Sequence, residues 1–318
     1  MKNEIEQDEL NLVELAQQYS DEDKARALLE SMLWPNGTVC PHCKNDGKAK
    51  AISAVKPRLT GGTRIRKGLY FCGVCRKQFT VTVGTVMEAT HIPLNKWVMA
   101  MFILCASKKS ISSHQLHRML KVTYKTAWFL SHRIRYAMGP DNANDTKLAG
   151  IVEVDETYVG GKGDLKTVSL RKTPVVALIE RGGQMRTKVV SNVTQKNLRT
   201  VITECVSTDA TLNTDESGVY RRQFRDYKRH DVVNHSKFEY SRRNKDGTKS
   251  HVNSCESFFS LLKRGVMGSW HHVSREHLPK YAGEFAFRWN HRDVTDGARM
   301  VKAVESTEGK RLTYRECV

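Results

Sequence analysis

Hydrophobic and polar positions alternate from Val152 to Asp155, at the start of residues 151–162, and the rest of the chain is organised around this stretch. Val152 and Val154 share one side of the predicted strand, whereas Glu153 and Asp155 share the other side. The strand is expected to be short, with Asp155 at its end. An acid at the end of a buried strand needs a hydrogen-bond donor, a cation or a metal as partner. Asp155 is therefore a candidate metal ligand, and an aspartate that merely caps the next turn is the alternative.

The pattern downstream predicts more of the same sheet. Residues 174–180 and 184–191 indicate a hairpin, residues 197–205 a helix, and residues 210–216 a strand that ends in Asp215 and Glu216. Three strands, a helix and a fourth strand, with acids at the ends of the first and fourth, is the order of ribonuclease H-like α/β folds. Glu153, Glu156 and Glu216 compete for the role of ligand, and the strand-end position favours Asp215.

Two other regions have helical spacing. Residues 8–33 predict two short helices that form a packing cap, with a capping box at Ser20–Asp23 before the second. Residues 93–138 predict three helices with a tight turn at 121–123, which resembles a helix-turn-helix. The last of these helices would expose Tyr124 and His132 together with candidate DNA contacts at Lys125, Arg133 and Arg135. A plain helical linker domain is the competing interpretation.

A further helix over residues 253–265 carries two different stripes. Phe258, Phe259 and Leu262 form its apolar side, and a second stripe consists of Asn253, Glu256, Ser260 and Lys263. An exposed Glu–Lys pair of this kind is commonplace. The stripe also suits an acid that reaches a metal while the lysine reaches DNA, and the helix is expected to end at Gly265.

Four cysteines form two close pairs, Cys40–Cys43 and Cys72–Cys75. Two residues between the cysteines of a pair let both thiolates approach one ion, so the pairs predict a structural zinc ribbon with four sulfur ligands. Replacement of one cysteine by His42 is the less favoured alternative. A hairpin around Gly61 and Gly62 would fill the gap between the pairs.

The net charge of this 318-residue chain indicates a polyanionic partner. It holds 52 Lys and Arg against 34 Asp and Glu, a formal charge of +18. Residues 48–67 contain seven bases and no acid, with candidate DNA contacts at Arg64, Arg66 and Lys67. Residues 221–249 contain ten bases against four acids and are expected to form an irregular, phosphate-facing loop that includes Arg242 and Arg243.

The sequence offers no sign of secretion or membrane insertion. Its first residues are acidic, without the apolar segment of a signal peptide, and the apolar run at residues 97–106 is too short to span a bilayer. We therefore expect a cytoplasmic protein without a membrane partner. The other four cysteines are scattered singly, which is typical of a reducing compartment.

Several stretches resemble bacterial insertion-sequence transposases of the zinc-ribbon group related to the eukaryotic Merlin superfamily. The similarity is carried by Trp34–Cys43, Lys125–Trp128, Val154–Thr157, Thr214–Ser217, Glu256–Arg264 and Phe285–Asn290. These stretches are distributed over nearly the whole chain. The resemblance implies a helical cap (1–36), a zinc ribbon (37–92), a helix-turn-helix-like domain (93–140), a ribonuclease H-like catalytic domain (148–292) and a C-terminal tail (293–318).

The same resemblance implies the chemistry of a DDE transposase, which cleaves DNA at element ends and transfers the 3′-OH into target DNA. Asp155, Asp215 and Glu256 would form the metal-binding triad, with Lys263 as the associated base and Arg264 as a further DNA contact. Some relatives carry Asn at the third acidic position. The implied cofactors are one structural zinc and two catalytic Mg²⁺ or Mn²⁺ ions. The implied partners are transposon ends, target DNA and further copies of the chain assembled on DNA, in a nucleoid-associated protein.

Two other functions fit parts of the pattern. A zinc-ribbon and helix-turn-helix regulator would bind DNA with a core that has no catalytic role, and metal-dependent nicking by the purified protein distinguishes it from a transposase. A structure-specific junction nuclease would cut DNA without joining a 3′-OH end to new DNA.

Overall fold

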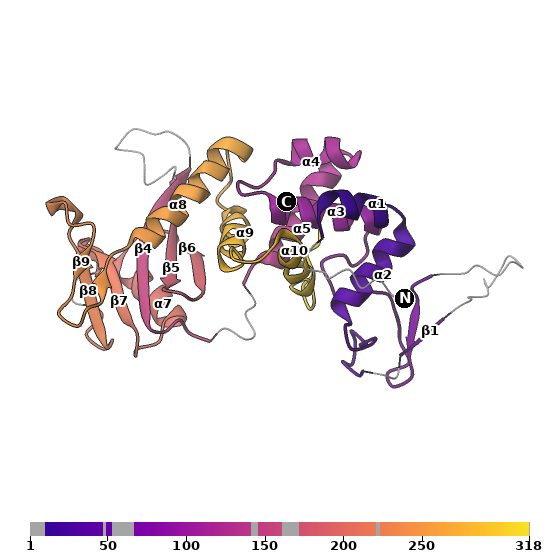
Figure 1. Cartoon of the computed structure of the whole chain (residues 1–318), viewed down its shortest axis with the longest axis horizontal. Coiled ribbons are helices and arrows are strands. Elements are labelled where there is room, and N and C mark those ends of the chain that lie inside the picture. Colours follow the sequence, from indigo (N-terminus) through magenta and orange to yellow (C-terminus); the bar gives the residue numbers. More distant parts are fainter. Residues whose placement is uncertain are drawn as a thin grey trace, which may run out of the picture. The chain divides into compact units, whose positions relative to one another are not determined.

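The computed structural model describes residues 10–46, 49–52, 67–140, 146–160, 172–220 and 223–317. The chain divides into two compact units, which are described separately (Figure 1). Unit 1 comprises residues 1–107, 111–138 and 293–318, and unit 2 comprises residues 108–110 and 139–292. No helix in the described part of the chain is both long and apolar enough to cross a membrane.

Unit 1 begins with the two predicted short helices, α1 (Leu12–Gln18) and α2 (Glu22–Leu33). Asn11 caps α1 through a capping box with Glu14. The cap of α2 is Asp21, whose carboxylate accepts hydrogen bonds from the backbone N–H groups of Asp23 and Lys24. The predicted cap at Ser20 was therefore wrong by one residue, because the carboxylate of Asp21 already occupies the free N–H groups of the first turn.

A small antiparallel sheet follows α2 in the order β1 (Ala49–Ala51), β2 (Tyr70–Cys72) and β3 (Gln78–Phe79). Trp34 packs edge-on against the rings of Tyr70 and Phe79, and these rings form a core beside the cysteine pairs. The predicted hairpin turn at residues 61 and 62, and with it Arg64 and Arg66, lies outside the described residues.

The three predicted helices of unit 1 are α3 (Leu94–Ala106), α4 (Ser113–Leu120) and α5 (Tyr124–Met138). Ser112 caps α4, and Lys121 ends it in a left-handed conformation. The segment expected to be a C-terminal tail contains a further helix, α10 (Asp296–Glu305), which contacts α2, α3 and α5.

The structure corrects the prediction that α5 exposes His132, Arg133 and Arg135. All three side chains are buried, and an Arg133 Nη atom donates to the backbone carbonyl of Glu88 at 2.6 Å. The Arg133 guanidinium also lies 5.1 Å from the ring centroid of Trp97. A buried arginine side chain is not accessible to a phosphate. Of the predicted contacts on α5, Lys125 alone is exposed.

Unit 2 is built on a five-stranded mixed sheet in the order β6-β5-β4-β7-β8. Strand β4 pairs antiparallel with β5 and parallel with β7, and β8 continues the parallel side. The strands are β4 (Ile151–Gly160), β5 (Lys172–Glu180), β6 (Met185–Val189), β7 (Thr211–Asp215) and β8 (Arg229–Val233). This is a ribonuclease H-like core, so the predicted fold class is confirmed.

Helices cover both faces of this sheet (Figure 1). Helix α7 (Gln195–Cys205) packs on the side of Val152 and Val154. Helices α8 (Asn253–Gly265) and α9 (Leu278–Asn290) pack on the opposite side, where Phe258 and Leu262 meet the side chains of β5. The predicted alternation of β4 and the predicted apolar side of α8 are both confirmed, and a π-helix, η4 (Val266–Trp270), follows α8.

Residues 223–249 contain more regular structure than the prediction of an irregular loop over 221–249 expected. They contain β8, the 3₁₀ helix η3 (His235–Lys237) and β9 (Arg242–Arg243), which pairs with β10 (Lys249–Ser250). An earlier 3₁₀ helix, η2 (Gly218–Tyr220), follows β7. The prediction of an irregular loop was wrong for these described residues, because β8 obtains its hydrogen bonds from β7.

Candidate active site

Strands β4 and β7 bring Asp155 and Asp215 to equivalent positions. The parallel pairing between the strands ends at Glu153 and Asn213, and each aspartate lies two residues further on. Asp215 ends β7, as predicted. Asp155 lies in the middle of β4 and pairs with Ala177, so its predicted place at a strand end was wrong. Hydrogen bonds from β5 prolong β4 beyond the point where β7 stops.

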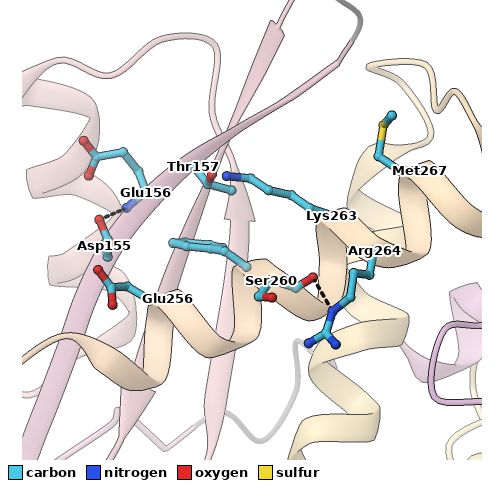
Figure 2. Close-up of a pocket in the computed structure, with 9 residues that line it drawn as sticks. Asp155, Glu156, Thr157, Glu256, Ser260, Lys263, Arg264 and Met267 are labelled. Carbon is cyan, nitrogen blue, oxygen red and sulfur yellow. Dashed lines mark hydrogen bonds between the residues drawn. The ribbon is translucent and has the colours of Figure 1, made fainter.

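Helix α8 adds Glu256 to these aspartates. In Figure 2 the carboxylate of Glu256 lies beside that of Asp155, at one end of a pocket of about 630 Å³. The pocket is lined by Asp155, Glu156, Thr157, Glu256, Phe259, Ser260, Lys263, Arg264 and Met267. The predicted polar stripe of α8 therefore faces a pocket at three of its four positions, Glu256, Ser260 and Lys263.

Burial and mutual repulsion disturb the ionisation of this cluster. Burial, together with the negative charges of Glu156, Asp215 and Glu256, raises the pKa of Asp155 to about 7. Burial also raises the pKa of Asp215, with a smaller contribution from Glu216. Among the described residues, no lysine or arginine forms an ion pair with Asp155 or Asp215. The two aspartates thus repel each other, and no lysine or arginine ion pair in the described part of the chain offsets this repulsion.

Two of the competing glutamates, Glu153 and Glu216, differ from the two aspartates in their hydrogen bonds. Glu153 is fully buried and accepts hydrogen bonds from the backbone N–H of Ser254 (2.9 Å) and Nε of Arg181 (2.8 Å). Glu216 accepts hydrogen bonds from the backbone N–H groups of His235 and Ser236, at 2.8 and 2.9 Å. Their oxygens are occupied by donors of the protein, so these acids hold the backbone in place.

Glu156 is an intermediate case. It lines the pocket, but its carboxylate accepts a hydrogen bond from the hydroxyl of the buried Tyr220. Burial raises the pKa of Glu156, and Asp215 adds to the effect. The Asp155 carboxylate differs from that of Glu156, because within the described residues it accepts its hydrogen bond from a backbone group. The donor is the backbone N–H of Glu156, at 2.8 Å.

The predicted basic residues lie in different surroundings. Lys263 and Arg264 line the pocket, and Arg264 Nε donates to the backbone carbonyl of Ser260 at 3.2 Å (Figure 2). Arg242 and Arg243 are exposed on β9. In unit 1, Lys67 is exposed and forms an ion pair with Asp23, and Lys125 Nζ lies 4.6 Å from the ring centroid of Tyr314.

Sequence reasoning missed His235 and Tyr220 as neighbours of the acids. His235 Nδ1 lies 3.7 Å from Oε1 of Glu256, and the positive form of His235 would lower the pKa of Asp215. His235 follows β8 by two residues. The position of His235 near the acids could not be predicted, because the sequence pattern did not predict strand β8, which places it there.

The four cysteines of unit 1 form a second candidate metal centre. Their Sγ atoms all lie within 4.8 Å of one another, at 3.6 Å for Cys40–Cys75 and 3.7 Å for Cys43–Cys72. The backbone N–H of Cys75 lowers the pKa of the Cys72 thiol, which favours the thiolate. Within the described ranges these cysteines are the one group of three or more His, Cys, Asp or Glu side chains whose ligand atoms lie close enough together to hold one ion, and neither His42 nor the acids of unit 2 belong to such a group. Four sulfur donors at this spacing fit a structural zinc ion.

The mixed sheet and the four-cysteine ribbon define the class of protein, a DDE transposase with a zinc ribbon. Residues 147–290 match the family model of the ISXO2-like transposase domain, and residues 20–78 match the transposase zinc-ribbon domain. The chain belongs to the ISXO2-like transposase family, and DNA is its implied substrate.

One curated protein and one solved structure are similar to this chain. The chain is 30% identical over 291 residues to an "Uncharacterized protein in transposable element ISH50" of Halobacterium salinarum, covering 85% of this chain and 91% of that protein. Among solved structures, it is similar to a chain of a simian T-cell lymphotropic virus intasome in complex with PP2A regulatory subunit B56 gamma. That likeness has a TM-score of 0.27 and 14% identity, and covers 54% of this chain and 67% of the other.

Proposed function

We propose that this transposase cuts DNA at the ends of its own element and joins the 3′-OH to target DNA, with Asp155, Asp215 and Glu256 as the metal-binding triad. The observation that carries the proposal is a cluster of acids around Asp155, in which neither Asp155 nor Asp215 has a lysine or arginine partner among the described residues and the pKa of Asp155 is raised. Such a cluster is costly when ionised, and a divalent cation removes the cost.

The donor set suits magnesium or manganese, because carboxylate oxygens are the ligands that these hard cations prefer. Asp155 from β4, Asp215 from β7 and Glu256 from α8 would hold two ions. When bound, such ions activate the attacking oxygen and stabilise the leaving oxygen of a phosphoryl transfer. Glu153 and Glu216 are poor ligands because their oxygens already accept hydrogen bonds from the protein.

The pocket supplies groups for binding the DNA strand. Lys263 and Arg264 present positive charge on α8, seven and eight residues after Glu256, and would hold phosphates near the scissile bond. Phe259 lines the same pocket and adds an apolar surface to it. Arg242, Arg243, Lys67 and Lys125 are proposed as more distant contacts, and Arg64 and Arg66 stay sequence predictions outside the described residues.

Transposition joins two DNA ends, so we propose that the protein acts as a homo-oligomer assembled on DNA in the nucleoid. The predicted relation to the Merlin superfamily and the predicted domain boundaries are part of the same proposal. The domain boundaries can be tested separately from the chemistry, because all three residues of the triad lie within unit 2.

The deciding experiment compares Asp155→Asn, Asp215→Asn and Glu256→Gln with Glu216→Gln in Mg²⁺-dependent cleavage and strand joining at the element's ends, beside a gel-shift assay. The two Asn variants should lose cleavage while binding metal-free DNA at least as well as wild type. Glu256→Gln should retain more activity, since some relatives carry an amide there. Glu216→Gln should keep most activity. Full cleavage by either Asn variant would contradict the proposed triad.

A further inference from the structure

Two aromatic side chains are strongly exposed in the segment after β8. Phe238 is 81% exposed and Tyr240 is 55% exposed, and Phe238 has the highest exposed fraction of any large hydrophobic side chain in the described chain. Both lie in residues 235–243, which we call the aromatic loop. Strongly exposed aromatic rings on a folded surface are typical of a binding site.

The aromatic loop is held in place at its start. The Glu216 carboxylate accepts hydrogen bonds from the backbone N–H groups of His235 and Ser236, and the Glu239 carboxylate accepts one from the backbone N–H of Asn234 at 3.0 Å. Phe238 has φ of +61°, a conformation that is uncommon for a bulky side chain. The backbone at Phe238 is therefore locally strained, and the ring is exposed to solvent.

The aromatic loop lies next to the candidate active site. Strand β8 ends at the same edge of the sheet as its parallel neighbour β7, which ends in Asp215. His235 Nδ1 is 3.7 Å from Oε1 of Glu256, and the ring centroids of His235 and Tyr240 are 5.6 Å apart. The backbone N–H of Phe238 donates to the carbonyl of His235 at 2.9 Å. A ligand on the Tyr240 ring would therefore lie close to Glu256.

The charge around the rings favours a nucleic acid as this ligand. The exposed side chains of Lys237, Arg242 and Arg243 flank Phe238 and Tyr240 in sequence. The acid within the loop, Glu239, pairs with Arg242 at 3.5 Å. Bases that are not paired in a duplex stack on aromatic side chains while basic side chains hold the adjoining phosphates.

We propose that Phe238 and Tyr240 form a stacking site for an unpaired base of the DNA end, next to the phosphate that is cut. This inference rests on the proposed function, because it takes DNA at the acids as given. The ligand is a single-stranded nucleotide splayed from the duplex end, bound through its ring face rather than through its base-pairing edge.

The test measures DNA affinity in the Asp155→Asn background without divalent metal, so that it does not depend on cleavage. Two probes are used, an element end that is fully paired and the same end with mismatches beside the cut site. The parent should prefer the mismatched end, and Phe238→Ala and Tyr240→Ala should each lower affinity for it about tenfold. Phe238→Trp should keep the preference and Phe238→Leu should lose it.

Tyr158→Ala is the matched control, since Tyr158 is an exposed tyrosine of unit 2 outside the aromatic loop. An unchanged preference in both loop variants would overturn the stacking site and leave the proposed function intact. A second copy of this chain is the other ligand that the exposed rings could bind, and size-exclusion chromatography tests it. Loss of self-association in Phe238→Ala with an unaltered DNA preference would assign the rings to contacts between copies and would also overturn the proposal. Loss of cleavage in Asp155→Asn with retained binding tests the triad separately.

Discussion

Glu153 on β4 and Ser254 at the start of α8 are joined by two hydrogen bonds. The backbone N–H of Ser254 donates to one carboxylate oxygen at 2.9 Å, and its hydroxyl donates to the other at 3.1 Å. Helix α8 receives no side-chain cap from its own N-cap residue, Val252. Glu153 therefore caps the helix from a neighbouring strand, and it fixes the helix that carries Glu256 against the strand that carries Asp155.

Replacing Glu153 by Gln should destabilise unit 2 by about 3 kcal/mol, because Arg181 loses its buried partner and α8 loses a charged cap. Urea unfolding followed by circular dichroism measures the change. Glu204→Gln is the control, since the Glu204 side chain is 58% exposed and should cost less than about 0.5 kcal/mol. An equal unfolding midpoint for both variants would show that Glu153 does not hold α8.

Zinc removal should affect unit 1 and spare the catalytic sheet. Four closely spaced thiols predict about one zinc per chain, and chelation should unfold the ribbon. Metal analysis of Cys72→Ser should show loss of zinc. Cys205→Ala is the control, because Cys205 is a buried cysteine of α7 in unit 2. Undiminished zinc in the Cys72 variant would rule out the four-sulfur site.

Lys263→Ala should weaken DNA binding and leave metal binding intact. If Lys263 contacts one phosphate, its removal should lower the slope of log affinity against log salt concentration by about 1. Fluorescence anisotropy at several salt concentrations gives this slope. Lys196→Ala provides the comparison, since Lys196 is exposed on α7, which covers the opposite side of the sheet. Identical slopes for the two variants would assign the phosphate contact to another residue.

Much of the sheet could be predicted from the sequence, because its central strands have a simple pattern. Val152 and Val154 alternate with acids, and the apolar run of β5 is typical of a buried strand. Strand β8 could not be found in this way, since four of its five residues are only partly buried. Its Arg229 pairs with Asp231, so its charges are neutralised within the fold rather than by phosphate.

The arginines of α5 show a second limit of the sequence. Basic side chains on a helix usually face solvent, and nothing local to residues 124–138 indicates that other elements cover Arg133 and Arg135. The carbonyl that Arg133 contacts belongs to Glu88, which is 45 residues away in sequence. The sequence could not decide among the candidate acidic ligands for the same reason. The donors that bind the carboxylates of Glu153 and Glu216 come from segments distant in sequence.

Asp155 should make the metal-free protein less stable as pH rises. Its pKa in the fold is about 7, well above the ordinary value near 3.8, so the folded state binds this proton more tightly than the unfolded state does. The contribution of Asp155 to the free energy of unfolding is then greatest below about pH 4 and falls as pH rises to about 7, by on the order of 4 kcal/mol.

Asp155→Asn removes the charge, so it should raise the melting temperature of metal-free protein at pH 8 and have little effect at pH 4. Thermal melts in EDTA at both values check this, with Asp209→Asn, an exposed aspartate, as the control. Added Mg²⁺ should stabilise the wild type at pH 8 and not the Asp155 variant. If Asp155→Asn melts at a lower temperature than wild type at pH 8 in EDTA, the Asp155 carboxylate is stabilised by a partner within the protein, and the prediction is wrong.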